Sequence, residues 1–163
     1  DIKGVGIANY NCPGQIVITG ETKAVEEAAD ALKEAGAKRT VMLNVSGPFH
    51  SPMLIPAGKE LEKELEKITL TPLLVPYVTN VTAEEVRDIS ETKALLAKQV
   101  SSPVRWMQSM EYMIERGVDT FVEIGPGRTL AGFMKKINRD VKVYNIGAWE
   151  DVEKTVSALG KER

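Results

Sequence analysis

His50 is the only histidine of the chain, and it lies in the segment Asn44-Val45-Ser46-Gly47-Pro48-Phe49-His50-Ser51-Pro52. An imidazole titrates near neutral pH, so a histidine on a segment shaped by glycine and proline is a candidate general base. The alternative is a loop histidine whose nitrogens make only structural hydrogen bonds. A base also needs a nucleophile to activate, and the serine-elbow pattern G-x-S-x-G does not occur in the sequence.

Two other places could carry chemistry. Cys12, the only cysteine, is a nucleophile in principle, although a lone cysteine is more often only a small residue. One histidine, one cysteine and no close-set carboxylates predict that the chain holds no metal. Gly125-Pro126-Gly127 follows an apparent strand and precedes a helix, where backbone N–H groups can face an anion. Proline removes one such donor, so a structural turn is the favoured interpretation.

The composition limits the classes of function. The 163 residues are enough for one compact domain or two small lobes, and 43% of them are hydrophobic. The net charge of -2 without a basic stripe argues against nucleic-acid binding. No apolar run is long enough to span a membrane. A single cysteine suits a reducing compartment, so we expect a cytoplasmic protein.

The elements that must position these residues fall into two parts. Residues 3–10 and 15–19 predict two strands around an Asn11-Cys12-Pro13-Gly14 turn, followed by a helix over 22–35 and a third strand over 39–45. In the predicted helix Thr22 is the cap, Gly36 the stop, and the buried face consists of Val25, Ala28, Ala29 and Leu32. A split β-α-β unit of ferredoxin type would need one more strand and helix in front.

The second part predicts alternating helices and strands, and therefore a parallel α/β arrangement. The first expected helix covers 53–67, with Leu61, Leu65 and Ile68 on its buried face. A second begins at Ser90 and includes Gln99, and a third is opened by Ser102-Pro103. Two further helices are expected over 129–137 and 151–159. The expected strands cover 74–78, which Pro76 makes an edge or irregular strand, 120–124 and 141–146.

Several segments together resemble the malonyl-CoA:acyl carrier protein transacylases. They are Asn9 to Gly20, then Gly47-Pro48-Phe49-His50-Ser51, then Gln99 with Ser102-Pro103-Val104-Arg105-Trp106, and finally Glu123-Ile124-Gly125-Pro126-Gly127. The resemblance runs along the whole chain and matches roughly the C-terminal half of those enzymes. It implies an α/β fold: residues 1–46 would be the remainder of a ferredoxin-like small subdomain. Residues 47–163 would be the C-terminal part of an α/β-hydrolase-like large subdomain with a parallel sheet.

The resemblance also implies a ping-pong transfer of malonyl from coenzyme A to the phosphopantetheine thiol of acyl carrier protein, through a serine ester and without a bound cofactor. His50 matches the family's catalytic histidine, and Gln99 matches the residue whose backbone carbonyl orients that imidazole. Asn9 and Asn11 match polar residues that line the site. Phe49 matches a position that tunes the acyl pocket, where a bulky ring would disfavour an α-methyl group and so favour malonyl over methylmalonyl.

The family's serine elbow, its oxyanion-hole segment and its malonyl-binding arginine are absent from this sequence. We therefore expect the chain alone to be inactive, and to act in fatty acid biosynthesis with an N-terminal half as partner. Coenzyme A thioester and acyl carrier protein would be the other partners. Two alternatives stay open: a non-catalytic module that binds acyl carrier protein, and a fragment of the acyltransferase domain of a polyketide-type synthase.

Overall fold

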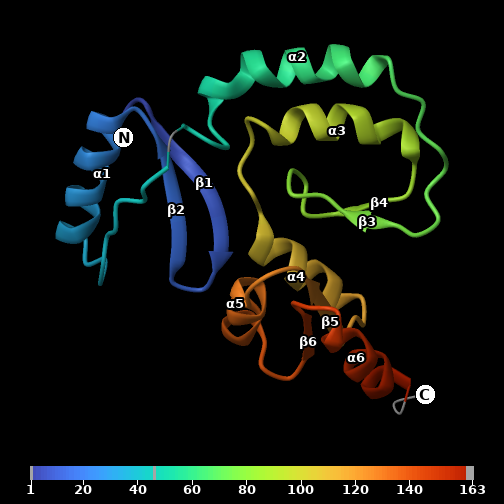
Figure 1. Cartoon of the computed structure of the whole chain (residues 1–163). Helices are drawn as coiled ribbons and strands as arrows, with labels where there is room; N and C mark the ends of the chain where they lie inside the picture. Colours follow the sequence, from blue (N-terminus) through green and yellow to red (C-terminus); the bar gives the residue numbers. More distant parts are fainter. Residues whose placement is uncertain (1, 46, 161–163) are drawn as a thin grey trace. The chain divides into compact units, whose positions relative to one another are not determined.

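The structure, a computed structural model of the chain, describes residues 2–45 and 47–160 (Figure 1). Within this range the chain divides into two compact units. One contains residues up to 11 and 15–106, and the other contains 12–14 and the residues from 107 on. The assignment of 1–46 and 47–163 to two family subdomains remains a prediction. Ser46 lies outside the described residues.

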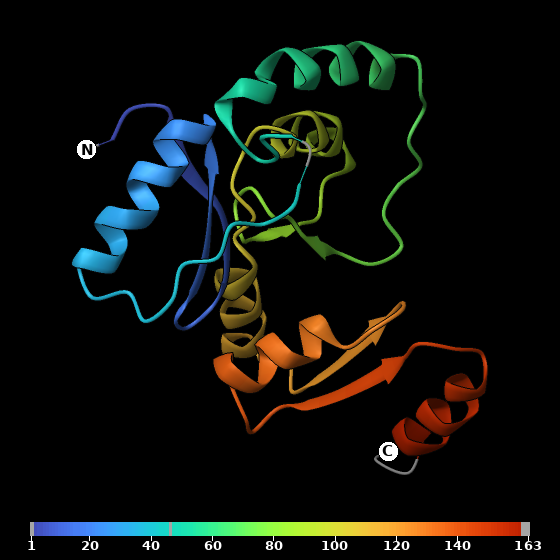
Figure 2. The ribbon, with the colours of Figure 1, turned by 60° about the vertical axis from the view of Figure 1, so that its left-hand side comes forward.

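The first unit begins with the predicted hairpin and helix. Strands β1 (Val5–Cys12) and β2 (Gln15–Gly20) are hydrogen-bonded neighbours, and Gly14 adopts a φ of 76° in the turn between them. Helix α1 (Thr22–Glu34) contacts β2, as Figure 2 shows, and ends before Gly36 with its φ of 97°. The N-cap is Glu21, which makes no side-chain capping bond, so the prediction that Thr22 caps the helix is wrong.

The buried face of α1 differs in part from the predicted one. Ala24 and Ala28 are buried, whereas Leu32 is exposed. The hairpin is only two strands wide, so it covers a narrow stripe of the helix and leaves its last turn open to solvent.

The predicted third strand over 39–45 is wrong, since this segment has no regular structure. Val41, Met42 and Leu43 are each more than half exposed. Val45 N–H donates to the Leu43 carbonyl at 3.0 Å, a tight local turn where a strand would bond to a neighbour. The apolar sequence is compatible with a strand, but a strand forms only where a second one supplies its hydrogen bonds.

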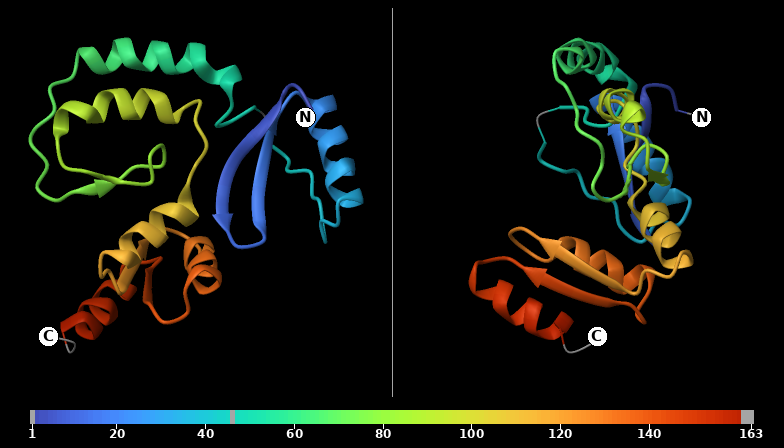
Figure 3. Two further views of the ribbon diagram at one scale, coloured as in Figure 1. Left: turned by 180° about the vertical axis from the view of Figure 1, so that it is seen from behind. Right: turned by 90° about the vertical axis from the view of Figure 1, so that its right-hand side faces the viewer.

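Two helices beyond this segment pack side by side. A short 3₁₀ turn, η1 (Pro52–Leu54), leads into α2 (Ile55–Glu66), which packs against α3 (Thr92–Gln99), as Figures 1 and 3 show. At Gly58 a Cβ atom would lie 2.9 Å from the Ala97 carbonyl oxygen, so the two backbones are in close contact. Of the predicted stripe on α2, Leu65 is buried, Leu61 is half-buried and Ile68 is half exposed.

A small antiparallel hairpin lies between these two helices in sequence. Strands β3 (Tyr77–Val78) and β4 (Glu85–Val86) pair Tyr77 with Val86. The strand predicted over 74–78 is thus confined to its last two residues, because Pro76 offers no N–H to a ladder. The turn η2 (Ile89–Glu91) then precedes α3, and the Asp88 carboxylate accepts the Ser90 N–H at 2.9 Å.

The helix predicted to open at Ser102-Pro103 begins only at Trp106, as α4 (Trp106–Glu115). The residues before it are not helical, and Val104 forms a parallel bridge with Asn9 of β1. A contact with a distant strand has therefore overridden the local preference for proline at the start of a helix. Gly117, with a φ of 87°, follows the end of α4.

The second unit confirms the parallel α/β prediction. Strands β5 (Thr120–Ile124) and β6 (Lys142–Ile146) are parallel, with Thr120 opposite Lys142 and Ile124 opposite Ile146. Helix α5 (Thr129–Ile137) connects them, and α6 (Glu150–Gly160) follows β6. Met134 of α5 is buried. No helix in the described part of the chain is long and apolar enough to cross a membrane.

Candidate functional site

His50 lies immediately before the helical segment η1–α2, and its neighbours fix its place. The Ser51 hydroxyl accepts the Met53 N–H at 3.2 Å, and Ser51 is only 2% exposed. Pro52 occupies the first helical position, where its missing N–H costs nothing. His50 itself has a φ of 58°, in the left-handed region that residues other than glycine seldom adopt. Such a conformation persists only where surrounding contacts impose it.

Those contacts come from residues about fifty positions along the chain. The His50 Nδ1 lies 3.1 Å from the Gln99 carbonyl oxygen and 3.2 Å from the Ser102 carbonyl oxygen. A carbonyl oxygen can only accept a hydrogen bond, so Nδ1 must carry the proton and donate it. The neutral ring then has its lone pair on Nε2. This is the tautomer that a general base needs when its second nitrogen faces the reacting group.

The Ser102 carbonyl was not predicted from the sequence. Placing Ser102-Pro103 inside a helix gave that carbonyl an intrahelical role and hid it. A signal was present, because the residue before a proline is biased away from the helical region and its carbonyl is then left without an intrahelical donor. In the structure Pro103 follows the end of α3, and the Ser102 carbonyl is turned to His50.

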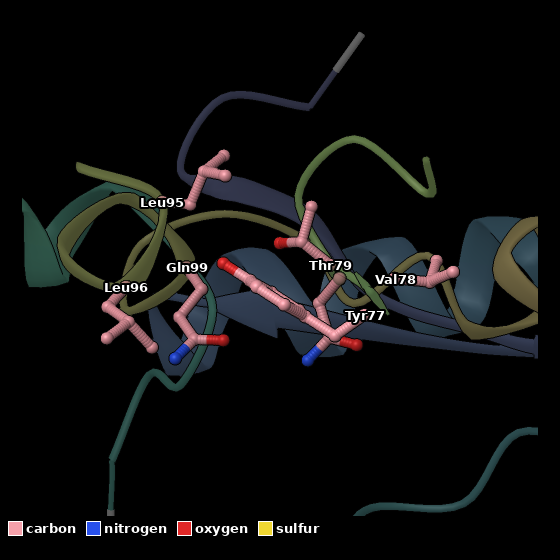
Figure 4. Close-up of a pocket in the computed structure, with 7 residues that line it drawn as sticks. Tyr77, Val78, Thr79, Leu95, Leu96 and Gln99 are labelled. Carbon is pink, nitrogen blue, oxygen red and sulfur yellow. The ribbon is translucent and has the colours of Figure 1, made fainter. Parts of the chain in front are cut away.

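The backbone carbonyl and the side chain of Gln99 lie in different surroundings. Its backbone carbonyl accepts from His50, while its side chain lines a separate hollow of about 210 Å³ beside Tyr77 and Leu95 (Figure 4). The hydroxyl of Tyr77, one of the lining residues, donates to the Thr92 hydroxyl at 3.0 Å. The group that meets His50 is thus a main-chain atom at the end of α3, and not the glutamine side chain.

Asn9 and Asn11 lie two residues apart on β1, so they share one face of that strand. The structure brings the main chain around Asn9 beside the Ser102–Arg105 segment. Val104 N–H donates to the Ala8 carbonyl at 2.7 Å, and Tyr10 N–H donates to the Val104 carbonyl at 2.9 Å. Asn9 is therefore held near the segment that also supports His50, and Asn11 lies one step further along the strand.

Phe49 precedes His50 and is 55% exposed. Its N–H donates to the Gly47 carbonyl at 2.9 Å, which folds the segment tightly. The ring edge lies 3.7 Å from the position that a Cβ atom would take at Gly47. The ring thus packs against the glycine, and more than half of the residue is open to solvent.

The turn Gly125-Pro126-Gly127 is structural, because the N–H groups that follow it are already bound. Leu130 N–H and Ala131 N–H of α5 donate to the two Glu123 carboxylate oxygens at 3.1 and 2.9 Å, and the Asn145 amide donates at 2.7 Å. Partial burial raises the pKa of Glu123, but these three hydrogen bonds outweigh it and hold the pKa below its ordinary value. Sequence reasoning gave Glu123 no role, although it is the side chain that fixes this turn.

Cys12 is buried, with 3% of its surface exposed, which fits a small core residue better than an attacking thiol. Among the described residues, no group of three or more histidine, cysteine, aspartate or glutamate side chains is arranged to hold a metal ion.

Comparison with known proteins places these features in context. Residues 1–157 match the sequence family described as the acyl transferase domain. The malonyl CoA-acyl carrier protein transacylase of Bacillus subtilis (strain 168) is 43% identical over 158 residues, which cover 97% of this chain and 50% of that protein. The corresponding protein of Staphylococcus aureus (strain COL) is 42% identical over 153 residues.

Solved structures agree. The malonyl CoA-acyl carrier protein transacylase of Clostridium perfringens superposes with a TM-score of 0.91 at 48% identity, over 98% of this chain and 50% of that one. A malonyl-transacylase solved in complex with a type II polyketide acyl carrier protein gives a TM-score of 0.91 at 37% identity, over 94% and 50%. The chain therefore spans about half the length of the relatives it matches.

Proposed function

The chain belongs to the acyl transferase domain family, and from that premise we propose that it forms the histidine-bearing portion of a malonyl-CoA:acyl carrier protein transacylase. The supporting observation is the pair of carbonyls that hold His50 Nδ1–H and leave Nε2 as the base. In this function malonyl passes from coenzyme A to a serine and then to the carrier's phosphopantetheine thiol. The setting is fatty acid biosynthesis in the cytoplasm.

His50 moves one proton back and forth. Its Nε2 takes the serine hydroxyl proton while that oxygen bonds to the thioester carbonyl carbon. The C–S bond then breaks, and the proton passes from Nε2 to the departing coenzyme A sulfur. In the second half-reaction Nε2 takes the carrier thiol proton while the sulfur bonds to the carbonyl carbon of the serine ester. The bond between that carbon and the serine oxygen then breaks, and the proton passes from Nε2 to the serine oxygen.

Uncharged acceptors for the imidazole N–H suit a substrate that carries a carboxylate. In the Ser-His-Asp arrangement a buried carboxylate holds the imidazole N–H. Here the Gln99 and Ser102 carbonyls take that position. They fix the tautomer without adding a negative charge close to the malonyl carboxylate, which would repel it.

The serine is assigned to the remaining half of the protein. The sequence contains no G-x-S-x-G pattern, and the relatives are about twice as long as this chain. We propose that this missing portion brings the nucleophile, the oxyanion-hole donors and the arginine for malonyl, and that the chain alone is inactive. Asn9, Asn11 and Phe49 would line the substrate site on this side.

Acyl labelling tests the proposal. The chain is incubated with malonyl-CoA alone and together with a polypeptide carrying the complementary half, and intact mass is measured. We expect no adduct on this chain and one malonyl on the complementary half. His50→Ala should slow that labelling by about 10²- to 10⁴-fold, the usual contribution of a general base. The control is Arg116→Ala, which changes an exposed arginine just after α4.

The possible results separate the alternatives. An adduct on this chain alone would refute the missing nucleophile. Labelling at the unaltered rate in His50→Ala would remove His50 from the mechanism. Binding of acyl carrier protein by the assembled pair without any acylation would favour the non-catalytic module.

Phe49→Ser tests the selectivity proposal. Loss of the ring makes room for an α-methyl group, so the preference for malonyl-CoA over methylmalonyl-CoA should fall about 10-fold or more, as expected for one methyl-sized group. Competition between the two thioesters in the assembled pair measures it. Trp149→Ser, at an 81% exposed aromatic, is the matched control. An unchanged preference in Phe49→Ser would refute the steric argument.

A further inference from the structure

We propose that Arg105 is a positioning residue that holds the Ser102 carbonyl against the His50 imidazole. Its consequence for catalysis rests on the proposed function, whereas its effect on the imidazole does not. The proposal begins from the two carbonyls that accept from Nδ1, because they are supported in different ways. Gln99 is the last residue of α3, so the helix fixes the backbone that carries its carbonyl. Ser102 lies outside any helix or strand, and its N–H reaches the Gln99 carbonyl only at 3.4 Å, so further contacts must fix it.

Those contacts lie in the three residues that follow Ser102. Pro103 restricts its own φ and disfavours the helical conformation at the residue before it. Val104 bonds to β1 on both sides, through the Ala8 carbonyl at 2.7 Å and the Tyr10 N–H at 2.9 Å. Arg105 N–H donates to the Asn80 carbonyl at 3.2 Å, and its guanidinium Nη1 donates to the Thr82 carbonyl at 2.8 Å. The segment is thus held between β1 and the turn of the β3–β4 hairpin.

The turn that receives Arg105 is itself well ordered by hydrogen bonds. Thr79 N–H donates to the Glu84 carbonyl at 3.2 Å, and Ala83 N–H donates to the Thr79 carbonyl at 2.9 Å. Ala83 is 4% exposed and has a φ of 60°, so a tight, buried turn presents the Thr82 carbonyl. A partly buried guanidinium that donates to such a carbonyl makes a charge-assisted hydrogen bond, stronger than a neutral one.

Loss of the guanidinium should therefore act on one of the two carbonyls only. The Ser102 segment would then be held only by its backbone bonds, those of Val104 and the Arg105 N–H, and the Ser102 carbonyl could move away from the ring. Gln99 would remain in place at the end of α3. With one of the two carbonyl acceptors less closely placed, the preference for the proton on Nδ1 weakens, and the tautomer with the proton on Nε2 gains population. That tautomer cannot accept a proton at Nε2.

The single histidine makes the test direct. Nitrogen-15 NMR of the 163-residue chain reports the two ring nitrogens of His50 without overlap from any other histidine. In the neutral ring of the unaltered chain, we expect the Nδ1 signal of a protonated nitrogen and the Nε2 signal of an unprotonated one. In Arg105→Met the two signals should move toward each other. Arg105→Lys, which keeps a donor for Thr82, should restore part of the difference.

Arg116→Met is the matched control, because Arg116, an exposed residue just after α4, also donates to a backbone carbonyl, that of Tyr112. It should leave both signals unchanged. If Arg105→Met fails to fold, Arg105→Gln, which keeps a polar but shorter side chain, replaces it. A folded Met or Gln variant with the original nitrogen signals would overturn the proposal, since a purely structural role lowers stability without changing the tautomer.

The assembled enzyme gives a second readout. There Arg105→Met should lower kcat by about 10- to 100-fold with KM for malonyl-CoA nearly unchanged, as expected when a catalytic group is slightly misplaced. If the assembled pair has no transacylase activity at all, the proposed function fails while the nitrogen signals still decide the role of Arg105.

Discussion

Two segments rich in glycine and proline, 47–52 and 125–128, each lead into a helix, yet they serve different ends. In the first, His50 Nδ1–H donates to carbonyls at and just beyond the C-terminal end of α3. Beside the second, the Glu123 carboxylate accepts N–H groups at the N-terminal end of α5. Both side chains thus pair with backbone groups that a helix end leaves unpaired. The His50 N–H pairs with carbonyls at a C-terminal end, and the Glu123 anion pairs with N–H groups at an N-terminal end.

The difference lies in what remains unbound. Both Glu123 carboxylate oxygens accept hydrogen bonds from groups that fix the turn. His50 uses one nitrogen, and within the described part of the chain its Nε2 has no hydrogen-bond partner. A polar side chain that anchors itself with one atom and keeps another available is suited to chemistry, whereas one that is saturated is structural. The comparison predicts distinct responses to substitution in the two regions.

The largest effect on stability should come from substitution of Gly58, with Gly132 as the matched control. Gly58→Ala places a Cβ 2.9 Å from the Ala97 carbonyl oxygen and forces α2 from α3, at a cost of about 1–3 kcal/mol. Better helix propensity offsets at most about 1 kcal/mol of this. Gly132→Ala on α5, where no atom lies within 4 Å of the new Cβ, should gain that propensity without a clash. Urea unfolding measures both, and a Gly58→Ala chain at least as stable as the parent would contradict the close contact.

Glu123→Gln should lower the unfolding free energy by about 1–2 kcal/mol, because an amide cannot accept from three donors as a carboxylate does. The folded-state pKa of Glu123 is depressed, so its contribution is complete above the ordinary value of 4.5 and is lost as the pH falls through the folded-state pKa. Urea unfolding from pH 7 downward should therefore show a shallower acid decline in the variant. Glu60→Gln, at an exposed pair with Lys63, is the control. Equal acid dependence in parent and variant would mean that Glu123 does not contribute to the loss of stability at low pH.

The smallest effect concerns backbone conformation. His50→Gly and His50→Ala both remove the imidazole, but only glycine accepts a φ of 58° without strain. The glycine variant should be the more stable of the two by about 1 kcal/mol, the cost of a left-handed residue. At Gly127, with a φ of 90°, alanine should likewise destabilise by about 1 kcal/mol. Thermal unfolding compares them. Equal stability of the two His50 variants would mean that the segment relaxes and that His50 is not held under strain.

The sequence predicted best the elements whose signals are local. The strand Thr120–Ile124 and the helix Thr129–Ile137 have the predicted bounds, because short apolar runs and a turn of two glycines delimit them. The strand over 39–45 was predicted on the same kind of signal and is wrong, since no neighbouring strand pairs with that segment in the described structure. At Ser102-Pro103 the local signal for a helix start lost to the bridge between Val104 and Asn9.

The sequence by itself determined that this chain has a single histidine, no serine elbow, and a Gly-Pro-shaped segment that presents His50. These follow from residue type and from neighbours a few positions away. Only the tertiary structure decided which nitrogen of His50 carries the proton, because the deciding carbonyls are 49 and 52 residues away. It also decided that Glu123 closes the second turn. Hydrogen-bond partners are chosen by distance in space, which the order of residues does not state.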